Sequence, residues 1–203
     1  MRFPLWRTAG LRHPPSGTSV THAEPSLVEK ILQIHSALAV AGIGHAFGGA
    51  LALAYYTQEP RATADIDLNV SLAASEARQA LLAMPTDVVW SADDVALVER
   101  DDQVRVWWGR TPIDLFFRAS SFHDGVAART AWMPFSDTEL PFLSANDLAV
   151  FKSLFDRPKD WLDISEMVAS GSLDTSSVAA VLESLIGPDA RLARLRAVGS
   201  RHS

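Results

Sequence analysis

Residues 46–70, AFGGALALAYYTQEPRATADIDLNV, place the strongest limits on how this chain can fold. They predict a short strand, a Gly-Gly turn, a helix, a loop and a second strand that carries two acidic residues. Strands and helices therefore alternate here, and the fold has to accommodate a charged strand within an otherwise apolar segment. Two features of this stretch point to chemistry as well as to architecture.

The first feature is the pair Gly48 and Gly49, which lies between an apolar run ending at Phe47 and a helical run beginning at Ala50. Glycine lets the backbone approach a ligand closely, and the free N–H groups that open a helix suit a phosphate. A glycine pair at a tight turn is more often plain turn chemistry. Both interpretations stay open on this pair alone.

The second feature is the pair Asp65 and Asp67. Because side chains alternate along a strand, the two carboxylates share one face, while Ile66 and Leu68 share the other. Neighbouring carboxylates repel each other and resist burial, so the strand needs a neutralising partner. A divalent cation, Mg²⁺ or Mn²⁺, prefers oxygen ligands and would supply that charge. An exposed strand end with two solvated acids is the alternative.

The rest of the chain contains mixed elements followed by a helical C-terminal part. Helices are predicted over residues 26–41, 50–57, 75–84, 159–169, 175–186 and 189–198, and from Ser144 onward. Strands are predicted over residues 45–47, 87–90, 103–108, 111–117 and 131–135, with a loop at 91–94. Gly109 and Arg110 form a hairpin turn, and the strand after them carries a single acid, Asp114. On its own, Asp114 is equally an edge residue or an acid held by a backbone donor.

Composition narrows the class of protein. The 203 residues include no cysteine, which excludes a disulfide framework and a thiolate metal site. The net charge of −6 argues against a broad nucleic-acid-binding surface, although a local basic groove is compatible with it. No apolar run is long enough to cross a membrane, and the N-terminus lacks the apolar core of a secretory signal. We therefore expect a cytoplasmic protein with no membrane partner.

The order of these motifs resembles the signature of the nucleotidyltransferase superfamily, in which a glycine turn and a helix precede a D-x-D strand. The matching residues are Gly48, Gly49, Arg61, Thr63, Asp65, Ile66, Asp67 and Leu68. Within the superfamily, the run R-x-T-x-D-I-D-L is most similar to bacterial AbiEii-type and related minimal nucleotidyltransferases, many of which are toxins of toxin–antitoxin pairs. The resemblance covers residues 44–70, 111–117 and 144–164.

The resemblance implies an α/β fold, with a small mixed β-sheet flanked by helices and a C-terminal helical portion. We accordingly divide the chain into a flexible N-terminal extension (1–24), a nucleotidyltransferase-like core (25–143) and a C-terminal helical region (144–203). It also implies that the acid on the later strand, Asp114, is the third carboxylate of the site, brought beside Asp65 and Asp67 by strand pairing.

Roles for the site residues follow from the same resemblance. Catalysis and binding of Mg²⁺ or Mn²⁺ are expected from Asp65, Asp67 and Asp114. Binding of the nucleotide, an NTP, is expected from Gly48, Gly49, Arg61, Thr63 and Lys152. In the run DLAVFKSLFDRPKDWLDI, further positive charge comes from Arg157 and Lys159, while Asp160 and Asp163 are expected to orient the cations or cap a helix. An ion-pair network that joins two helices is the alternative for these acids.

The predicted reaction is transfer of a nucleoside monophosphate from an NTP to an acceptor hydroxyl. By resemblance, we expect an RNA 3′ end such as that of tRNA as the acceptor, and a cognate antitoxin as a further partner. A small antibiotic-type acceptor, whose positive charge would suit an acidic protein, is the enzymatic alternative. A non-catalytic nucleotide-binding module is the alternative that involves no reaction. A D-x-D glycosyltransferase needs more chain ahead of the acids, and a HAD-type phosphatase needs Thr or Val in place of Asn69.

Overall fold

A computed structural model of the chain describes residues 24–58 and 62–200. Of the predicted extension over residues 1–24, only Glu24 is among the described residues. The predicted nucleotide ligand Arg61 also lies outside them. No helix within these two segments combines the length and the apolar character that a membrane span requires.

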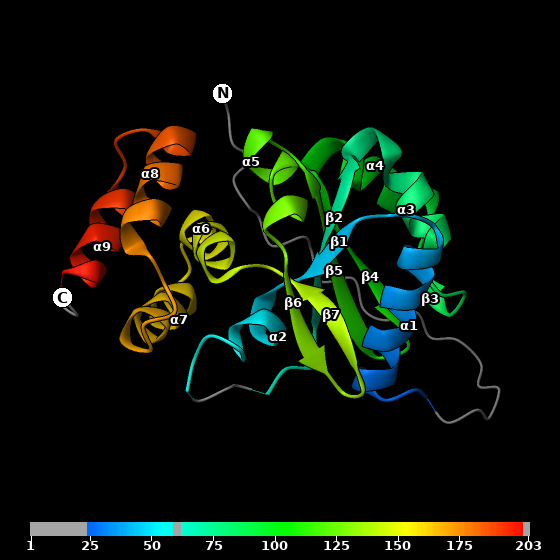
Figure 1. Cartoon of the computed structure of the whole chain (residues 1–203). Helices are drawn as coiled ribbons and strands as arrows, with labels where there is room; N and C mark the ends of the chain where they lie inside the picture. Colours follow the sequence, from blue (N-terminus) through cyan, green and yellow to red (C-terminus); the bar gives the residue numbers. More distant parts are fainter. Residues whose placement is uncertain (1–23, 59–61, 201–203) are drawn as a thin grey trace.

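The centre of the fold is a mixed seven-stranded sheet in the order β3-β4-β5-β2-β1-β7-β6 (Figure 1). Its strands are β1 (His45–Phe47), β2 (Ile66–Ala73), β3 (Val88–Val89), β4 (Gln103–Trp108), β5 (Thr111–Arg118), β6 (Ala131–Phe135) and β7 (Thr138–Phe142). β2 runs parallel to β5, and β1 runs parallel to β7, while the other neighbours are antiparallel. The predicted α/β class with a mixed sheet is confirmed.

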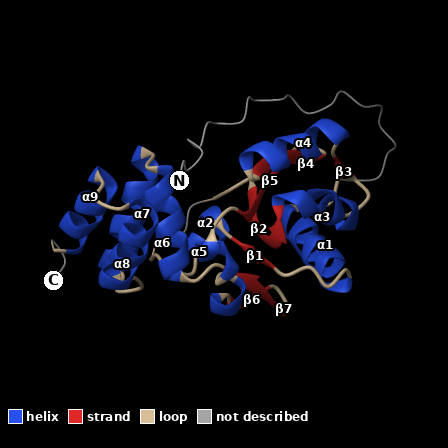
Figure 2. Cartoon of the chain, turned by 90° about the horizontal axis from the view of Figure 1, so that it is seen from above, coloured by secondary structure: helices blue, strands red, loops and turns tan. Residues whose placement is uncertain are grey.

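Helices cover the sheet on both sides. They are α1 (Leu27–Val40), α2 (Gly49–Leu53), α3 (Ala77–Ala83), α4 (Ala92–Asp101), α5 (Ser121–Asp124), α6 (Ala145–Phe155), α7 (Pro158–Ala169), α8 (Thr175–Ile186) and α9 (Ala190–Gly199), with 3₁₀ turns η1 (Ala74–Glu76) and η2 (Ala127–Arg129). Helices α1, α3 and α4 lie on one side, and α2, α5 and the group α6 to α9 lie on the other (Figures 1 and 2). The last four helices pack on one another, and α6 contacts α2.

The two faces of the central strands differ because side chains alternate along each strand. The face toward α1, α3 and α4 is apolar, and its fully buried members on β2 and β5 include Ile66, Leu68, Ile113, Leu115 and Phe117. The other face carries the polar residues Asp67, Asn69 and Asp114. The apolar face therefore builds core, and polar side chains are left on the side of α6 and α7.

One predicted loop is wrong, because residues 91–94 begin helix α4. The backbone N–H and the hydroxyl of Ser91 donate to Oδ2 of Asp94 at 2.7 and 2.8 Å, which secures the first turn. A Ser-x-x-Asp capping pattern, followed by Val95 and Val98 at helical spacing, was the signal available in the sequence.

Strand β7, which contains Pro141, was not predicted. The strand forms because it pairs with β6 along its length but meets β1 only where Phe47 lies opposite Phe142.

Helix α2 is shorter than the predicted 50–57 and ends at Leu53. Beyond this point, the Tyr55 hydroxyl donates to the carbonyl of Pro134 at 2.6 Å and the Tyr56 hydroxyl donates to that of Leu143 at 2.9 Å. These tertiary hydrogen bonds accompany a turn in place of further helix.

Candidate active site

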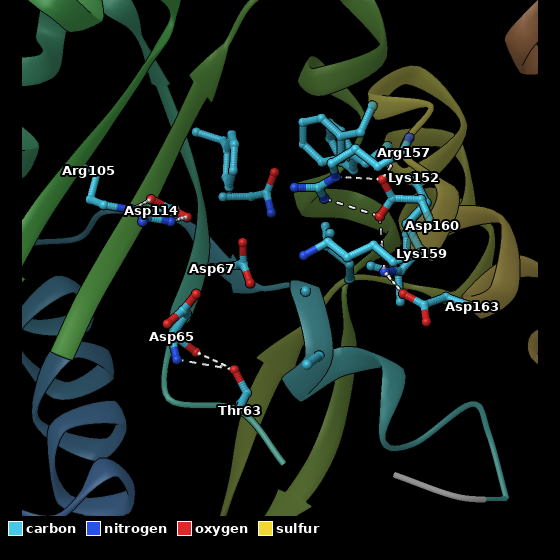
Figure 3. A pocket seen from close by; sticks show the side chains of 18 residues that line it. Thr63, Asp65, Asp67, Arg105, Asp114, Lys152, Arg157, Lys159, Asp160 and Asp163 are labelled. Carbon is cyan, nitrogen blue, oxygen red and sulfur yellow. Dashed lines mark hydrogen bonds and ion pairs between the residues drawn. The ribbon is translucent and has the colours of Figure 1, made fainter. Parts of the chain in front are cut away.

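The three acids predicted from the sequence lie on one face of the sheet. Asp67 and Asp114 stand opposite each other on β2 and β5, and adjacent strands are about 4.8 Å apart. Asp65 lies immediately before β2, and its side chain lines the same cavity as Asp67. All three line a cavity of about 140 Å³ between the sheet and helices α6 and α7 (Figure 3). Parallel pairing thus brings the third acid to the other two, as predicted.

The glycine turn between β1 and α2 lies against the same acids. The N–H of Gly48 donates to the backbone carbonyl of Asp67 at 2.9 Å, which fixes the turn to β2. Gly49 has φ of 54°, and a Cβ placed on it would lie 1.8 Å from Oδ2 of Asp67. Glycine is needed at position 49 both for its left-handed backbone and for the room it leaves to the carboxylate.

Asp67 carries the clearest electrostatic signature of the site. Its pKa is raised to about 6, first by burial and then by the nearby Asp114 and Asp65, while Lys152 and Arg157 act in the opposite direction. A buried carboxylate with two further carboxylates nearby is stabilised by added positive charge, so this face suits a cation.

Arg105 on β4 belongs to the site, and the sequence analysis missed it. It lies opposite Asp114 in the β4–β5 pair, and its Nε and Nη2 donate to Oδ1 and Oδ2 of Asp114, both at 2.7 Å. This hydrogen-bonded pair raises the pKa of Arg105, and the charges of Asp65 and Asp67 add to the effect. The available signal was the two-residue turn at 109–110, which sets positions 105 and 114 opposite each other.

Helices α6 and α7 form the opposite wall of the cavity (Figure 3). The buried Lys152 donates to Oδ2 of Asp163 at 2.6 Å, and its Nζ lies 3.8 Å from Oδ1 of Asp160. The fully buried Asp160 accepts hydrogen bonds from the backbone N–H of Arg157 at 3.2 Å and from its Nε at 2.6 Å. These acids orient the cations and join the two helices at once, so the two interpretations drawn from the sequence describe one network.

Lys159 differs from the other two cations of this wall. It lies exposed in the first turn of α7 and lines the cavity. No hydrogen bond or ion pair joins its ammonium group to any residue of segments 24–58 and 62–200. Its charge is therefore available to an anion in the cavity.

The other residues predicted to bind the nucleotide differ in how they lie relative to the cavity. The Thr63 hydroxyl accepts from the backbone N–H of Asp65 at 3.1 Å and donates to its carbonyl at 3.2 Å, so it shapes the entry to β2. Thr63, Gly49 and Lys152 line the cavity, whereas the buried Gly48 lies behind it. Arg61 lies outside the described residues.

The acids fit Mg²⁺ or Mn²⁺ in kind, because three carboxylates offer the oxygen donors that these hard ions prefer. The raised pKa of Asp67 shows that added positive charge would be favourable there. Within the described part of the chain, no three acidic, histidine or cysteine side chains are gathered closely enough to hold an ion. The guanidinium fork that holds Asp114 toward β4 is a physical reason for this spacing (Figure 3). Metal binding stays a prediction.

Comparison with known proteins supports the fold. No protein-family model matches the chain, and no curated protein matches it. Among solved structures, the solution structure of the antibiotic-resistance factor ANT(2'')-Ia matches with a TM-score of 0.51 and 16% identity, over 86% of this chain and 96% of that one. A crystal structure of ANT(2")-Ia with adenylyl-2"-tobramycin gives a TM-score of 0.48 and 15% identity, over 87% and 98%. An antigenic nucleotidyltransferase-like protein from Paracoccidioides brasiliensis gives 0.46 and 16%, over 83% and 92%.

At this level of identity, the first of these matches establishes a nucleotidyltransferase-like fold for the chain. The match does not extend to the AbiEii-type subgroup, so that part of the resemblance stays a prediction.

Proposed function

We propose that the chain is a metal-dependent nucleotidyltransferase that moves a nucleoside monophosphate from an NTP to an acceptor hydroxyl. The observation that carries the proposal is the acidic face of β2 and β5 lying across the cavity from the cationic wall of α6 and α7. An acidic face alone would repel a triphosphate, and a cationic wall alone would repel a metal ion. The two together suit a triphosphate that arrives with a divalent cation.

The cationic wall supports binding of the phosphate chain. Lys152, held by Asp163, presents a fixed charge at the floor of the cavity, and Lys159 adds an exposed charge at the start of α7. Because Gly49 has no side chain, the backbone of the turn can approach the same phosphates. By resemblance, Arg61 joins this set.

The acidic face supports the chemical step. Asp65, Asp67 and Asp114 would hold the divalent cation, which supplies polarisation of the α-phosphoryl group and neutralises the departing pyrophosphate. Asp114, by resemblance, would also help to accept the proton of the acceptor hydroxyl. Asp67, with its pKa raised to about 6, is ionised for this work at neutral pH.

The acceptor is proposed from resemblance and charge. An RNA 3′ end remains the first candidate, in a toxin-like role with a cognate antitoxin. The net charge of −6 favours a second candidate, a small cationic acceptor such as an aminoglycoside. The structure most similar in fold among those reported above is described as an antibiotic-resistance factor, which supports testing this candidate alongside RNA.

The test is incubation with each α-³²P-labelled NTP and Mg²⁺, with either total tRNA or an aminoglycoside as the acceptor. We expect label on one acceptor with the wild-type chain and loss of that label with Asp67→Asn. Asp137→Asn is the matched control, because Asp137 is exposed in the turn between β6 and β7. Transfer that persists in Asp67→Asn would contradict the metal assignment. Absence of both transfer and Mg²⁺-dependent NTP binding in the wild type would contradict the function.

A further inference from the structure

Arg105 has no role in the chemistry proposed above, yet it hydrogen-bonds to Asp114, one of the three acids of the site. Its guanidinium binds both oxygens of Asp114 at 2.7 Å, with side-chain exposures of 30% for Arg105 and 22% for Asp114. Both residues line the cavity. The pair is therefore neither a fully solvated surface contact nor a buried structural one, and it lines the cavity in which the substrate is proposed to bind.

The charge balance shows what Arg105 does in this arrangement. Across the cavity, Lys152 and Arg157 are already paired with Asp163 and Asp160. Within residues 24–58 and 62–200, Arg105 provides the one cationic side chain hydrogen-bonded to a carboxylate of the acidic face. Arg105 is thus the counter-ion of that face in the structure described here.

A guanidinium in this position competes with a metal ion in two ways. Its fork uses a lone pair on each oxygen of Asp114, and it fixes the direction in which the carboxylate points. Its positive charge also repels a second cation, and that repulsion is strong where water is partly excluded. A divalent ion can gain Asp114 as a full ligand when the guanidinium moves away.

We propose that Arg105 is a positioning residue that holds Asp114 apart from the other two acids until a divalent cation displaces it. Arg105 therefore sets the concentration of divalent cation that the site requires. This inference rests on the proposed function, because it takes the acidic face to be the metal site.

The experiment measures Mn²⁺ binding to the protein directly, from the electron paramagnetic resonance signal of unbound Mn²⁺, in buffer without nucleotide. The full chain is compared with Arg105→Met, which keeps an unbranched side chain as far as the position of Nε and removes the charged guanidinium. We expect Arg105→Met to bind Mn²⁺ about tenfold more tightly, or better, because a competing cation at hydrogen-bonding distance has been removed. Thermal unfolding of each variant verifies that it folds.

Two further variants make the readout specific. Arg100 binds both oxygens of Asp101 with the same fork, at 2.9 and 2.6 Å, on the exposed surface of α4. Arg100→Met therefore removes the same charge away from the cavity, and it should leave Mn²⁺ affinity at the wild-type value. The double variant Arg105→Met/Asp114→Asn should lose the gain, because the inference requires the gain to act through Asp114.

The outcomes separate this inference from the proposed function. Wild-type or weaker affinity in Arg105→Met, or an undiminished gain in the double variant, would overturn the role of Arg105. Asp67→Asn tests the metal site without involving Arg105: wild-type Mn²⁺ affinity in that variant would overturn the proposed function itself. The role of Arg105 and the proposed function are both supported if Arg105→Met binds Mn²⁺ more tightly than the wild type and each of the other variants behaves as expected.

Discussion

Strands β2 and β5 present Leu68 and Leu115 to one side of the sheet, and Asp67 and Asp114 to the other. The two leucines are buried in the core, whereas the two aspartates are opposed like charges beside a cavity. One backbone pairing therefore produces both a stable layer and an electrostatically unfavourable one. Alternate positions of the same strands are therefore expected to control different properties. The face with the leucines controls stability, and the face with the aspartates controls chemistry.

The largest effect is expected from Asp67→Asn. We expect nucleotidyl transfer to fall about 1,000-fold, because one of the three carboxylates that would hold the divalent cation is lost. The melting temperature should not fall, since the substitution also removes repulsion from Asp114 and Asp65. Initial transfer rates, measured with whichever acceptor the labelling experiment identifies, give the activity. Calorimetry gives the melting temperature. A large drop in melting temperature would show that this face also stabilises the fold.

Leu68→Ala, on the neighbouring residue of the same strand, should give the opposite result. Leu68 is fully buried, so the cavity left by truncation is expected to lower the free energy of unfolding by about 2–5 kcal/mol. The residual folded protein should keep near-normal transfer per active molecule. Urea unfolding and active-site titration at low temperature measure the two quantities. Normal stability with lost activity would break the comparison between the faces.

The fold class was readable from the resemblance of the motifs to those of nucleotidyltransferases, and the shared face of the acidic pair was readable from local pattern. Asp65 and Asp67 alternate with Ile66 and Leu68, and that alternation alone assigns the acids to one face. Arg105 was also within reach, because the two-residue turn after it fixes its partner. Of this cross-strand pair, only Asp114 was predicted as a site residue.

Other parts of the site depend on contacts that no local pattern encodes. The pairing of Lys152 with Asp163 is set by how α6 packs on α7, across a chain reversal at residues 156–157. Strand β7 contains Pro141 and is held chiefly by its partner β6. In both cases, tertiary packing decides the outcome, whereas sequence patterns report local preference.

Gly49→Ala is expected to act on the acidic face through the backbone beside it. A Cβ would lie 1.8 Å from Oδ2 of Asp67, and the φ of 54° is unfavourable for alanine. We expect the carboxylate to move, transfer to fall about tenfold or more, and stability to fall by roughly 1–2 kcal/mol from the backbone term alone. Gly171→Ala is the control, with φ of 72° but nothing within 4 Å of the added atom. Equal losses of activity in both variants would refute a specific role for the contact with Asp67.

The smallest effect is a difference in how stability depends on pH. The folded pKa of Asp67, about 6, lies above its ordinary value of 3.8, so the folded state binds more protons between these values. The stabilisation from protonated Asp67 is therefore present below about pH 4 and is lost as the pH rises through about 6. In metal-free buffer, Asp67→Asn should gain melting temperature relative to the wild type between pH 4 and pH 7. A constant difference across that range would show that Asp67 titrates normally.

The cationic wall of the cavity comes from helices that follow all seven strands in the chain. During synthesis, Asp65, Asp67 and Asp114 leave the ribosome before Lys152, Arg157 and Lys159. Because the chain emerges from its N-terminal end, the acids of this face are made before Lys152 and Lys159 of the cationic wall. A nascent molecule is thus expected to reject nucleotides by charge alone. Affinity for nucleotides is expected to rise once α6 and α7 have emerged.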